Sequence, residues 1–530
     1  MAIIENDKET PIYLVNFENY LKPKAQSILI EENSIIHDKV KNKLKAKTKT
    51  SFQLFCELSS IHGMSMLSLT KSASICERIA WKIIIITSII ITCSVLYYWT
   101  AINYETPTVS LIETNAFPGY IVPFPAITLC SLNRISKKKA IELAEKFSLN
   151  SNLTREKILE LFEMPLYINE NVHANKQDFQ MFDDLLSANN STLLDLFYHT
   201  NPDCMEELKR CMWQGRAVQC ASIFEPVVVL RGRCCAFNYF AREDNQTKRY
   251  NKFLIPSPKP RRVSGCGYQT GLTVLIDPQA SDYQAGALKF HGYRVIVADA
   301  YDFPEDNGNN EIFGIQQEAY VAVKTTVMIG TTYLRNMPLW KRGCIFDAEY
   351  KLKYFREYSY WNCLAECFSG RLLEHCGCVT HNMVQPDGVP MCDLKKFNCV
   401  LHENDAFQKL VEDADILGSK ICNCMAECSY FKYHTVVSSG RLNRTYVKGY
   451  HRFFKNITTT DEILLHVYFS DLNTAKYRID AIESWQSIVG TVGGIAGMTM
   501  GINVVCIAEV FFFVCIRPLY MKYVKANSNP

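Results

Sequence analysis

The chain has almost no excess of charge of either sign. Its 57 lysines and arginines are balanced by 54 aspartates and glutamates, which gives a net charge of +3 over 530 residues. A protein that coats nucleic acid needs a strongly basic surface, so this balance excludes that class. With 48% hydrophobic residues, the chain is also too apolar to be disordered. The composition indicates folded domains, with or without membrane anchors.

Catalytic and metal-binding motifs are missing as well. The sequence contains no nucleophile elbow, zincin helix, phosphate-binding loop or EF-hand loop. Its closely spaced ectodomain cysteines form C-x-C and C-x-x-x-C pairs, not the C-x-x-C pairs of zinc ribbons and thioredoxin-like sites. We therefore expect that the protein is not an enzyme and that it holds no metal and no cofactor.

A signal peptide is the third feature that the sequence lacks. Residues 1–78 are rich in lysine and have no apolar run of about 7 to 15 residues. Two long apolar runs occur further on: residues 83–99 carry no charge, and residues 488–516 carry one ionisable side chain, Glu509. Each run, with its flanks, can cross a hydrocarbon core of about 30 Å. We predict two transmembrane helices, at 79–100 and 487–516.

Cysteine, in contrast, is abundant. Of 22 cysteines, 17 lie between Cys130 and Cys428, and therefore between the two apolar runs. Such density is typical of disulfides formed in an oxidising compartment. The same interval contains the Asn-x-Ser/Thr sequons, which are glycosylated only on the lumenal side of the membrane. These predicted glycosylation sites are Asn152, Asn189, Asn190, Asn245, Asn443 and Asn456.

Basic residues flank the two runs on the opposite side from the cysteines. Arg78 and Lys82 precede the first run, and Arg517, Lys522 and Lys525 follow the second. Because positively charged flanks stay cytoplasmic, both termini are predicted to be cytoplasmic. We therefore expect a multi-pass plasma membrane protein. Its predicted parts are a cytoplasmic tail (1–78), a helix (79–100), an ectodomain (101–486), a second helix (487–516) and a cytoplasmic tail (517–530).

The ectodomain mixes two kinds of pattern. Residues 225–231, 271–276 and 293–298 are short, β-branched runs typical of strands. Residues 137–147 and 403–417 are longer and show helical spacing of their apolar side chains. The predicted fold class is therefore α+β, in a two-span transmembrane subunit with a large disulfide-rich ectodomain.

The second apolar run is dense in glycine, with five glycines in twelve residues: Gly490, Gly493, Gly494, Gly497 and Gly501. Glycine costs about 1 kcal/mol relative to alanine inside a helix. Such density, in a run longer than one span requires, predicts a broken or swapped helix. Three of the glycines are spaced by four and share a helix face, which lets another backbone approach closely.

Two polar side chains, Asn503 and Glu509, follow these glycines within the same run. Unpaired carbonyls at membrane depth are tolerated when they are buried or line water, and rings of carbonyls can replace an ion's hydration shell. The run therefore favours an ion pathway, whereas a packing helix in an oligomeric receptor would explain the glycines alone. Because one or two helices cannot enclose a pore, a channel requires several subunits.

Four features in this order resemble the degenerin/epithelial sodium channel family. They are His62-Gly63 before the first run, the sequence FPAITLC at 124–130, the cysteine series at 344–428, and the glycines of the second run. The resemblance extends from about residue 55 to about residue 516 and is strongest to invertebrate pickpocket-type subunits.

The family implies a fold, with a β-sheet palm and a disulfide-stapled helical thumb. It also implies a trimeric, sodium-preferring, amiloride-sensitive cation channel opened by an extracellular mechanical, chemical or ligand stimulus. Na⁺ would be the permeant ion, the partners would be related subunits in a homo- or heterotrimer together with membrane lipid, and nucleic acid would have no role.

The resemblance also implies roles for single residues. His62 and Gly63 match a gating motif, and Gly490 matches a position where a bulky side chain is expected to hold the pore open. Glu509 matches a conserved acid after the filter. Asn503 departs from the family's Gly-x-Ser filter, because it stands in place of the serine. The implied filter is Gly501, Ile502 and Asn503, and the implied packing glycines are Gly493, Gly494 and Gly497.

Seven disulfides are implied in the same way. They pair Cys130 with Cys234, Cys211 with Cys220, Cys344 with Cys428, Cys363 with Cys424, Cys367 with Cys422, Cys376 with Cys399, and Cys378 with Cys392. Cys204, Cys235 and Cys266 are left over, so at least one thiol is free or bonds another subunit.

Other functions stay open at this stage. The chain could be a modulatory subunit, or a ligand-binding receptor without a pore. It could also be a different two-span trimeric ligand-gated channel, although a nucleotide-gated one would need a basic phosphate pocket.

Overall fold

The computed structural model describes residues 51–68, 74–105, 107–168, 176–229, 232–242, 257–286, 288–304, 309–380, 388–412, 422–442, 453 and 461–527. The chain divides into two compact units. One comprises Met1–Glu105 with Glu483–Pro530, and the other is Thr106–Ile482. This division falls close to the predicted ends of the ectodomain, 101 and 486.

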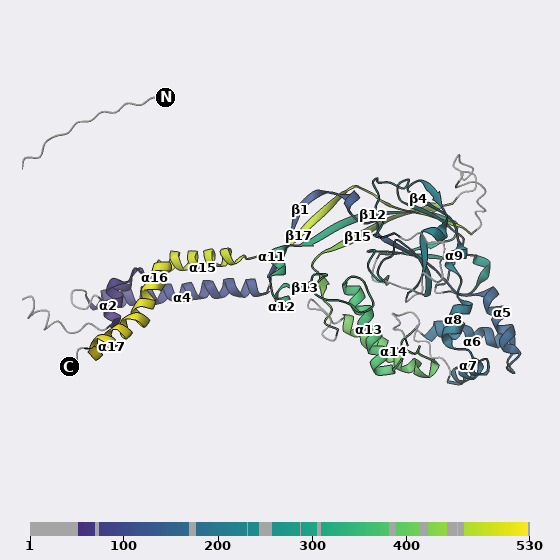
Figure 1. The fold of residues 1–530 in the computed structure, drawn as a ribbon, viewed down its shortest axis with the longest axis horizontal. Coiled ribbons are helices and arrows are strands. Elements are labelled where there is room, and N and C mark those ends of the chain that lie inside the picture. The colour runs from purple at the N-terminus through teal and green to yellow at the C-terminus, as the bar shows by residue number, and fades with distance from the viewer. Residues whose placement is uncertain are drawn as a thin grey trace, which may run out of the picture. The chain divides into compact units, whose positions relative to one another are not determined.

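The first unit is helical (Figure 1). Its helices are α2 (Ser51–Leu58), α3 (Met64–Leu67), α4 (Ile75–Glu105), α15 (Trp485–Met500), α16 (Val504–Phe511) and α17 (Arg517–Asn527), with a π-helical turn at Phe512–Ile516 between α16 and α17. Within the described residues, two helical stretches are long and apolar enough to cross a membrane, Ile75–Glu105 and Val504–Met521.

Helix α4 is apolar on nearly all sides. It has 31 residues, and the only buried side chains among them are those of Ile85 and Thr92. A helix that leaves isoleucines exposed all around it would be unfavourable in water, and it is suited to lipid. The predicted helix at 79–100 lies within α4.

The second apolar run is not one continuous helix. α15 ends at Met500, residues 501–503 are not helical, and α16 begins at Val504. With 16 residues, α15 is shorter than the roughly 20 residues that a span needs. The interruption agrees with the broken helix that the glycine density predicts.

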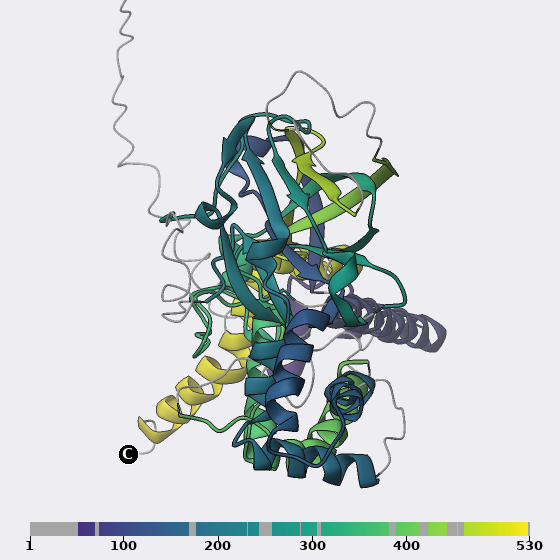
Figure 2. The same ribbon diagram turned by 90° about the vertical axis from the view of Figure 1, so that its right-hand side faces the viewer.

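The second unit is built on β-sheets (Figure 2). Its strands are β1 (Thr108–Pro118), β2 (Ala126–Ser131), β3 (Asn133–Ser136), β4 (Leu208–Trp213), β5 (Arg216–Val218), β6 (Phe224–Val229), β7 (Gly232–Phe237), β8 (Leu272–Ile276), β9 (Tyr283–Gly286), β10 (Gly292–Ala298), β11 (Asn309–Gly314), β12 (Gln317–Gly330), β13 (Cys344–Ile345), β14 (Ala426–Glu427), β15 (Tyr430–Arg441), β16 (Ile463–Phe469) and β17 (Asn473–Ala481). The runs predicted at 225–231, 271–276 and 293–298 correspond to β6, β8 and β10, and residues 230 and 231 lie outside the described residues.

The larger sheet has eight strands in the described part of the chain. Seven follow the order β1, β17, β12, β16, β8, β4 and β5, and β15 pairs with β12 outside this path. β12 is the long central strand: it is antiparallel to β15, and parallel first to β16 and then to β17. Its inward side chains Ala319, Val321 and Val323 are fully buried and alternate with outward ones, as the two-residue period of a strand requires.

The smaller sheet has the strand order β11, β10, β2, β7 and β6. An aromatic cluster joins it to the larger sheet. The ring of Phe124 lies 5.0 Å from Trp213 of β4 and 6.0 Å from Phe237 of β7. Phe469 of β16 completes the cluster, 5.4 Å from Phe124. The two sheets therefore share one hydrophobic core.

The helices of this unit are α5 (Lys137–Ser148), α6 (Arg155–Ile168), α7 (Lys176–Ala188), α8 (Leu193–Thr200), α9 (Cys204–Glu207), α11 (Thr332–Arg335), α12 (Leu339–Arg342), α13 (Tyr360–Cys376) and α14 (Phe397–Glu412), with short 3₁₀ helices at Gly119–Ile121, Cys220–Ser222, Ala280–Asp282 and Leu394–Lys396. The views agree that α5 to α8 lie together (Figures 1 and 2), and they share a separate core. The helix predicted at 137–147 is α5. The helix predicted at 403–417 corresponds to α14, which begins six residues earlier, at Phe397, whose ring lies 5.9 Å from that of Phe179 in α7; residues 413–417 lie outside the described residues.

Eight disulfides stabilise this unit, and all 22 cysteines of the chain lie among the described residues. Seven bonds are the pairs that the family resemblance implies. The eighth joins Cys204 and Cys235, which the sequence left unassigned. Cys266 is then the free thiol of the ectodomain, and it is exposed.

Three of the predicted glycosylation sites lie among the described residues. Asn152 and Asn190 are exposed. Asn189 is partly covered, and its amide nitrogen donates to the carbonyl of Leu185 at 2.9 Å. Asn190 is therefore better placed than Asn189 to accept a glycan. The sites at Asn245, Asn443 and Asn456 lie outside the described residues.

Candidate functional site

The interruption between α15 and α16 is built from a helix end followed at once by a helix start. Gly501 is the C-cap of α15 in the left-handed region (φ 67°, ψ 22°), and its N–H donates to Gly497 O at 2.9 Å. Glycine is favoured there because it has no Cβ to oppose that conformation. Asn503 is the N-cap of α16, and its Oδ1 accepts from Cys506 N at 3.1 Å. The predicted filter, Gly501-Ile502-Asn503, is this interruption.

The His-Gly motif lies against the same place. The backbone N–H of His62 donates to Met500 O, one of the last carbonyls of α15, at 3.1 Å. A Cβ added to Gly501 would collide with the imidazole of His62, so the ring fills the space that a side chain would need. Gly63 has φ 82° and precedes α3. The structure thus brings together two motifs that are separated by more than 400 residues in the chain.

A second set of contacts connects Ser60 to α16. The N–H of Ser60 donates to the Glu509 carboxylate at 3.0 Å, and the hydroxyl of Ser60 lies 3.1 Å from Cys506 Sγ. The Cys506 thiol is buried and also lies 3.5 Å from Asn503 N and 3.8 Å from Gly501 O. Glu509 therefore has the partner that a carboxylate at membrane depth requires.

Sequence reasoning did not find Ser60 or Cys506. The only signal for Cys506 is its position three residues after the N-cap, where a side chain can reach back to the cap's N–H. Ser60 has no such signal, because its partners are distant in the sequence.

The other glycines of α15 have no close neighbour within the described chain. A Cβ added to Gly490, Gly493 or Gly494 would meet no atom within 4 Å, and one added to Gly497 would meet only Ile502 O at 3.7 Å. Close packing inside this chain therefore does not explain why these positions are glycine.

Comparison with protein families matches residues 55–513 to the amiloride-sensitive sodium channel family. The chain belongs to this family.

Several curated channels are similar to it over most of their length. Pickpocket protein 11 of Drosophila melanogaster is 25% identical over 97% of this chain and 92% of its own length. The sodium channel protein Nach of Drosophila ananassae is 23% identical, over 92% of this chain and 91% of its own. The human bile acid-sensitive ion channel is 23% identical, over 87% and 86%. The family predicted from sequence is confirmed, and it is a family of ion channels, in agreement with the prediction that the chain is not an enzyme.

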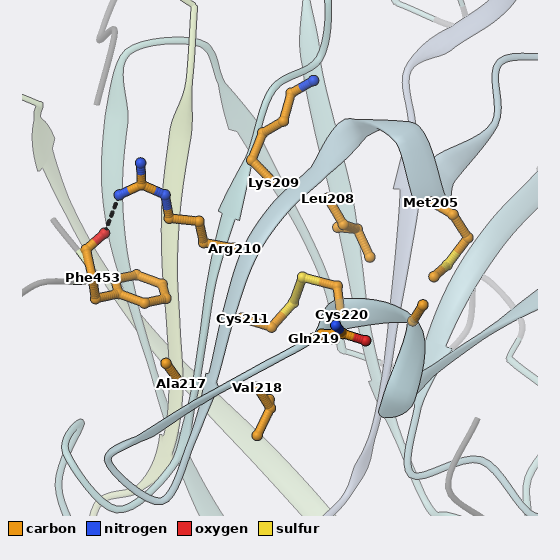
Figure 3. Close-up of a pocket in the computed structure, with 11 residues that line it drawn as sticks. Met205, Leu208, Lys209, Arg210, Cys211, Ala217, Val218, Gln219, Cys220 and Phe453 are labelled. Carbon is orange, nitrogen blue, oxygen red and sulfur yellow. Dashed lines mark hydrogen bonds between the residues drawn. A yellow bond between two sulfur atoms is a disulfide. The ribbon is translucent and has the colours of Figure 1, made fainter. Parts of the chain in front are cut away.

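The β-sheet unit contains two cavities that the sequence did not predict. One, of about 680 Å³, has an apolar wall formed by Met205, Leu208 and Val218 and by the Cys211–Cys220 disulfide (Figure 3). Its basic groups are engaged: Lys209 pairs with Asp277 at 3.5 Å, and the guanidinium of Arg210 donates to the carbonyl of Phe453. The walls therefore present mainly apolar surface.

The other cavity, of about 740 Å³, is rich in carboxyl groups. Burial raises the pKa of Asp299 to about 6 and that of Glu357 to about 7. Burial also raises the pKa of Asp302, Asp347 and Glu427. These groups bind protons more readily than exposed carboxyls, which reduces the negative charge of the cavity. No group of three or more His, Cys, Asp or Glu side chains in the described residues has an arrangement that could hold a metal ion.

Glu207 is another buried carboxyl in this unit. The hydroxyls of Tyr293 and Ser131 both donate to it. Burial nevertheless raises its pKa from 4.5 to about 8, because the hydrogen bonds only partly offset the loss of water.

We expect Glu207 to make the β-sheet unit less stable as the pH rises. The folded state holds this proton more tightly than the unfolded state, so the stabilisation is complete below about pH 4.5 and is lost as the pH rises through about 8. Thermal unfolding of the purified chain between pH 5 and pH 8 measures the slope. Glu207→Gln should flatten it, whereas Glu142→Gln, at a carboxylate whose side chain is 69% exposed, should not. Equal slopes in both variants would contradict the assignment.

Proposed function

We propose that the chain is a subunit of a trimeric, sodium-preferring, amiloride-sensitive cation channel of the plasma membrane, opened by an extracellular stimulus. Both termini are cytoplasmic, Na⁺ is the permeant ion and not a cofactor, and the partners are related subunits in a homo- or heterotrimer. The observation that carries the proposal is the interruption at Gly501-Ile502-Asn503 with the His62 segment bound to it. A helix that only anchors a protein in the membrane does not need such an interruption.

Trimer formation would account for the glycine face of α15. Gly490, Gly493 and Gly494 leave open space in the single chain, which a neighbouring subunit can enter. Symmetric assembly would place three copies of the interruption around one axis, so that peptide groups at 501–503 surround an ion.

Asn503 fits the geometry of this filter but changes its chemistry. It caps α16 as a serine would, since both residues are favoured N-caps. Its Oδ1 already accepts from Cys506 N, so cation coordination falls mainly to backbone carbonyls. The sodium preference of this subunit would then depend on the shape of the turn at 501–503.

In the ectodomain, residues 101–486, we assign the eight-stranded sheet as the palm and α13 with α14 as the thumb. Four disulfides lie in or next to these two helices, and one of them, Cys376–Cys399, joins the helices directly. A fifth, Cys344–Cys428, closes the segment that contains both helices. Each bond stabilises by typically 2 to 4 kcal/mol. A thumb so constrained can act as a rigid lever that transmits a stimulus to the membrane helices.

The test is the current carried by Gly490→Val in a cell without other channels of this kind. A Cβ at position 490 would meet no atom of the described residues within 4 Å, so we expect the fold to be preserved and the effect to arise from neighbouring subunits around the axis. We expect a sodium current that amiloride blocks, several-fold above that of the wild type. Whole-cell recording with surface labelling measures it.

The matched control is Gly370→Val in α13, another helical glycine with open space around its Cβ. It should leave the current at the wild-type level. If Gly490→Val reaches the surface and stays silent, also when expressed with related subunits, the chain is a modulatory subunit or a receptor without a pore.

A further inference from the structure

Three hydroxyl groups connect α4 to the end of α15. Ser88 Oγ donates to Thr499 O at 2.8 Å. Thr92 Oγ1 lies 2.7 Å from Thr499 Oγ1, which itself lies 2.8 Å from Ile495 O. Thr92 Oγ1 likewise lies 2.8 Å from a carbonyl of its own helix, Ser88 O. Since each hydroxyl has one hydrogen, one of the two threonines donates to the other, and that other donates to the carbonyl of its own helix. The result is a chain of hydrogen bonds that runs from one helix into the other.

This polar chain includes one of the two buried side chains of α4. Thr92 is 6% exposed, and the only other buried side chain of α4 is Ile85, which is the neighbour that a Cβ on Gly63 would meet at 3.4 Å. The two covered positions of α4 therefore face the two parts of the site. Ile85 lies beside the His62-Gly63 segment, and Thr92 contacts Thr499, which is two residues before Gly501.

The hydrogen bonds act on backbone groups that have no partner within their own helix. The last four carbonyls of a helix need partners from outside it. At the end of α15, Ser88 supplies one for Thr499 O, and the N–H of His62 supplies one for Met500 O. A slide or rotation of α15 would break both bonds at once.

We propose that Ser88, Thr92 and Thr499 are positioning residues for the turn at 501–503. They set the depth and rotation at which α15 presents this turn, and in this way they set the cation selectivity of the pore. The selectivity part rests on the proposed channel function. A hydroxyl chain that only helped the helices to assemble would change the amount of protein at the surface and leave selectivity unchanged.

The first measurement is the Na⁺/K⁺ permeability ratio of Thr92→Val and Thr499→Val, recorded in the Gly490→Val background. Each should change the ratio by about threefold, the factor that corresponds to an average interhelical hydrogen bond in a membrane protein. Because both substitutions remove the same bond, the double variant should change it no more than either single one. Thr499→Ser, which keeps the hydroxyl, should restore the ratio. Thr87→Val, at an exposed position of α4, is the matched control.

The second measurement does not depend on current. The Cys506 thiol is 1% exposed and contacts the turn at Gly501 and Asn503, so its reaction with N-ethylmaleimide reports local opening. Peptide mapping should show Cys506 modified about threefold faster or more in Thr92→Val and Thr499→Val, and unchanged in Thr87→Val.

Permeability ratios and labelling rates that match those of Thr87→Val would overturn the inference, as would multiplicative effects in the double variant. If the reference channel reaches the surface and conducts nothing, also when expressed with related subunits, the proposed function fails. Faster labelling of Cys506 would then still support the positioning role, and unchanged labelling would reject it.

Discussion

Replacing Gly501 by alanine is expected to abolish the current of a channel that still reaches the cell surface. Gly501 has φ 67°, a conformation that costs an L-residue roughly 1 to 2 kcal/mol. The added methyl group would also collide with the imidazole of His62. Both effects displace the turn that joins α15 to α16. Recording sodium current together with surface labelling separates loss of conduction from loss of the protein.

Gly497→Ala is the matched control, one helical turn earlier. A Cβ there would meet only Ile502 O at 3.7 Å, and alanine is about 1 kcal/mol more favourable than glycine in a helix. It should conduct. Adding His62→Ala to Gly501→Ala removes the collision but not the backbone cost, so part of the current should return. A Gly501→Ala channel that conducts like the wild type would show that the His62 ring does not occupy this space.

The sequence predicted local features of this site well. The break of the second helix follows from the glycine density. The role of Asn503 as the N-cap of α16 was not predicted, although asparagine is a favoured N-cap residue. The positions of β6, β8 and β10 follow from short β-branched runs, and that of α5 follows from the helical spacing of its apolar residues. These features depend on neighbours within a few residues, which the sequence displays directly.

The contacts that bring the site together could not be predicted from those local patterns. His62 to Met500, Ser60 to Glu509 and Thr92 to Thr499 join segments more than 400 residues apart. The sequence does not indicate which distant residue a backbone N–H or a serine hydroxyl will bond. For the same reason, the sequence did not predict the parallel pairing of β12 with both β16 and β17.

The disulfides show the same limit. Seven pairs are implied by the family resemblance, because that family has a known pattern. Cys204 and Cys235 were left over, because spacing alone does not choose a connectivity. In the structure, Cys234 and Cys235 are neighbours on β7, so their side chains point to opposite faces of the strand. Cys234 bonds Cys130 of β2, and Cys235 bonds Cys204 of α9.

Removing the Cys204–Cys235 disulfide is expected to destabilise the ectodomain strongly. The bond closes a loop with a sequence separation of 31 residues. In the chain-entropy model, loops of this size correspond to about 3 to 4 kcal/mol of free energy of unfolding. Both sulfurs are buried, with Cys204 2% and Cys235 0% exposed, so the paired Cys204→Ala and Cys235→Ala substitution also leaves unfilled space. Thermal unfolding of the detergent-solubilised chain should show a large fall in Tm, with less protein at the surface.

Cys266→Ser is the control, because Cys266 is the exposed free thiol of the same unit and its loss removes no bond. It should keep the wild-type Tm. Cys204→Ser alone should be at least as harmful as the paired substitution, since it loses the same bond and buries a serine hydroxyl at a position that is 2% exposed. If the paired variant unfolds at the temperature of Cys266→Ser, the bond contributes nothing to stability. The link between α9 and β7 would then depend on packing alone, through contacts such as that between Cys235 Sγ and Met205 Sδ at 3.0 Å.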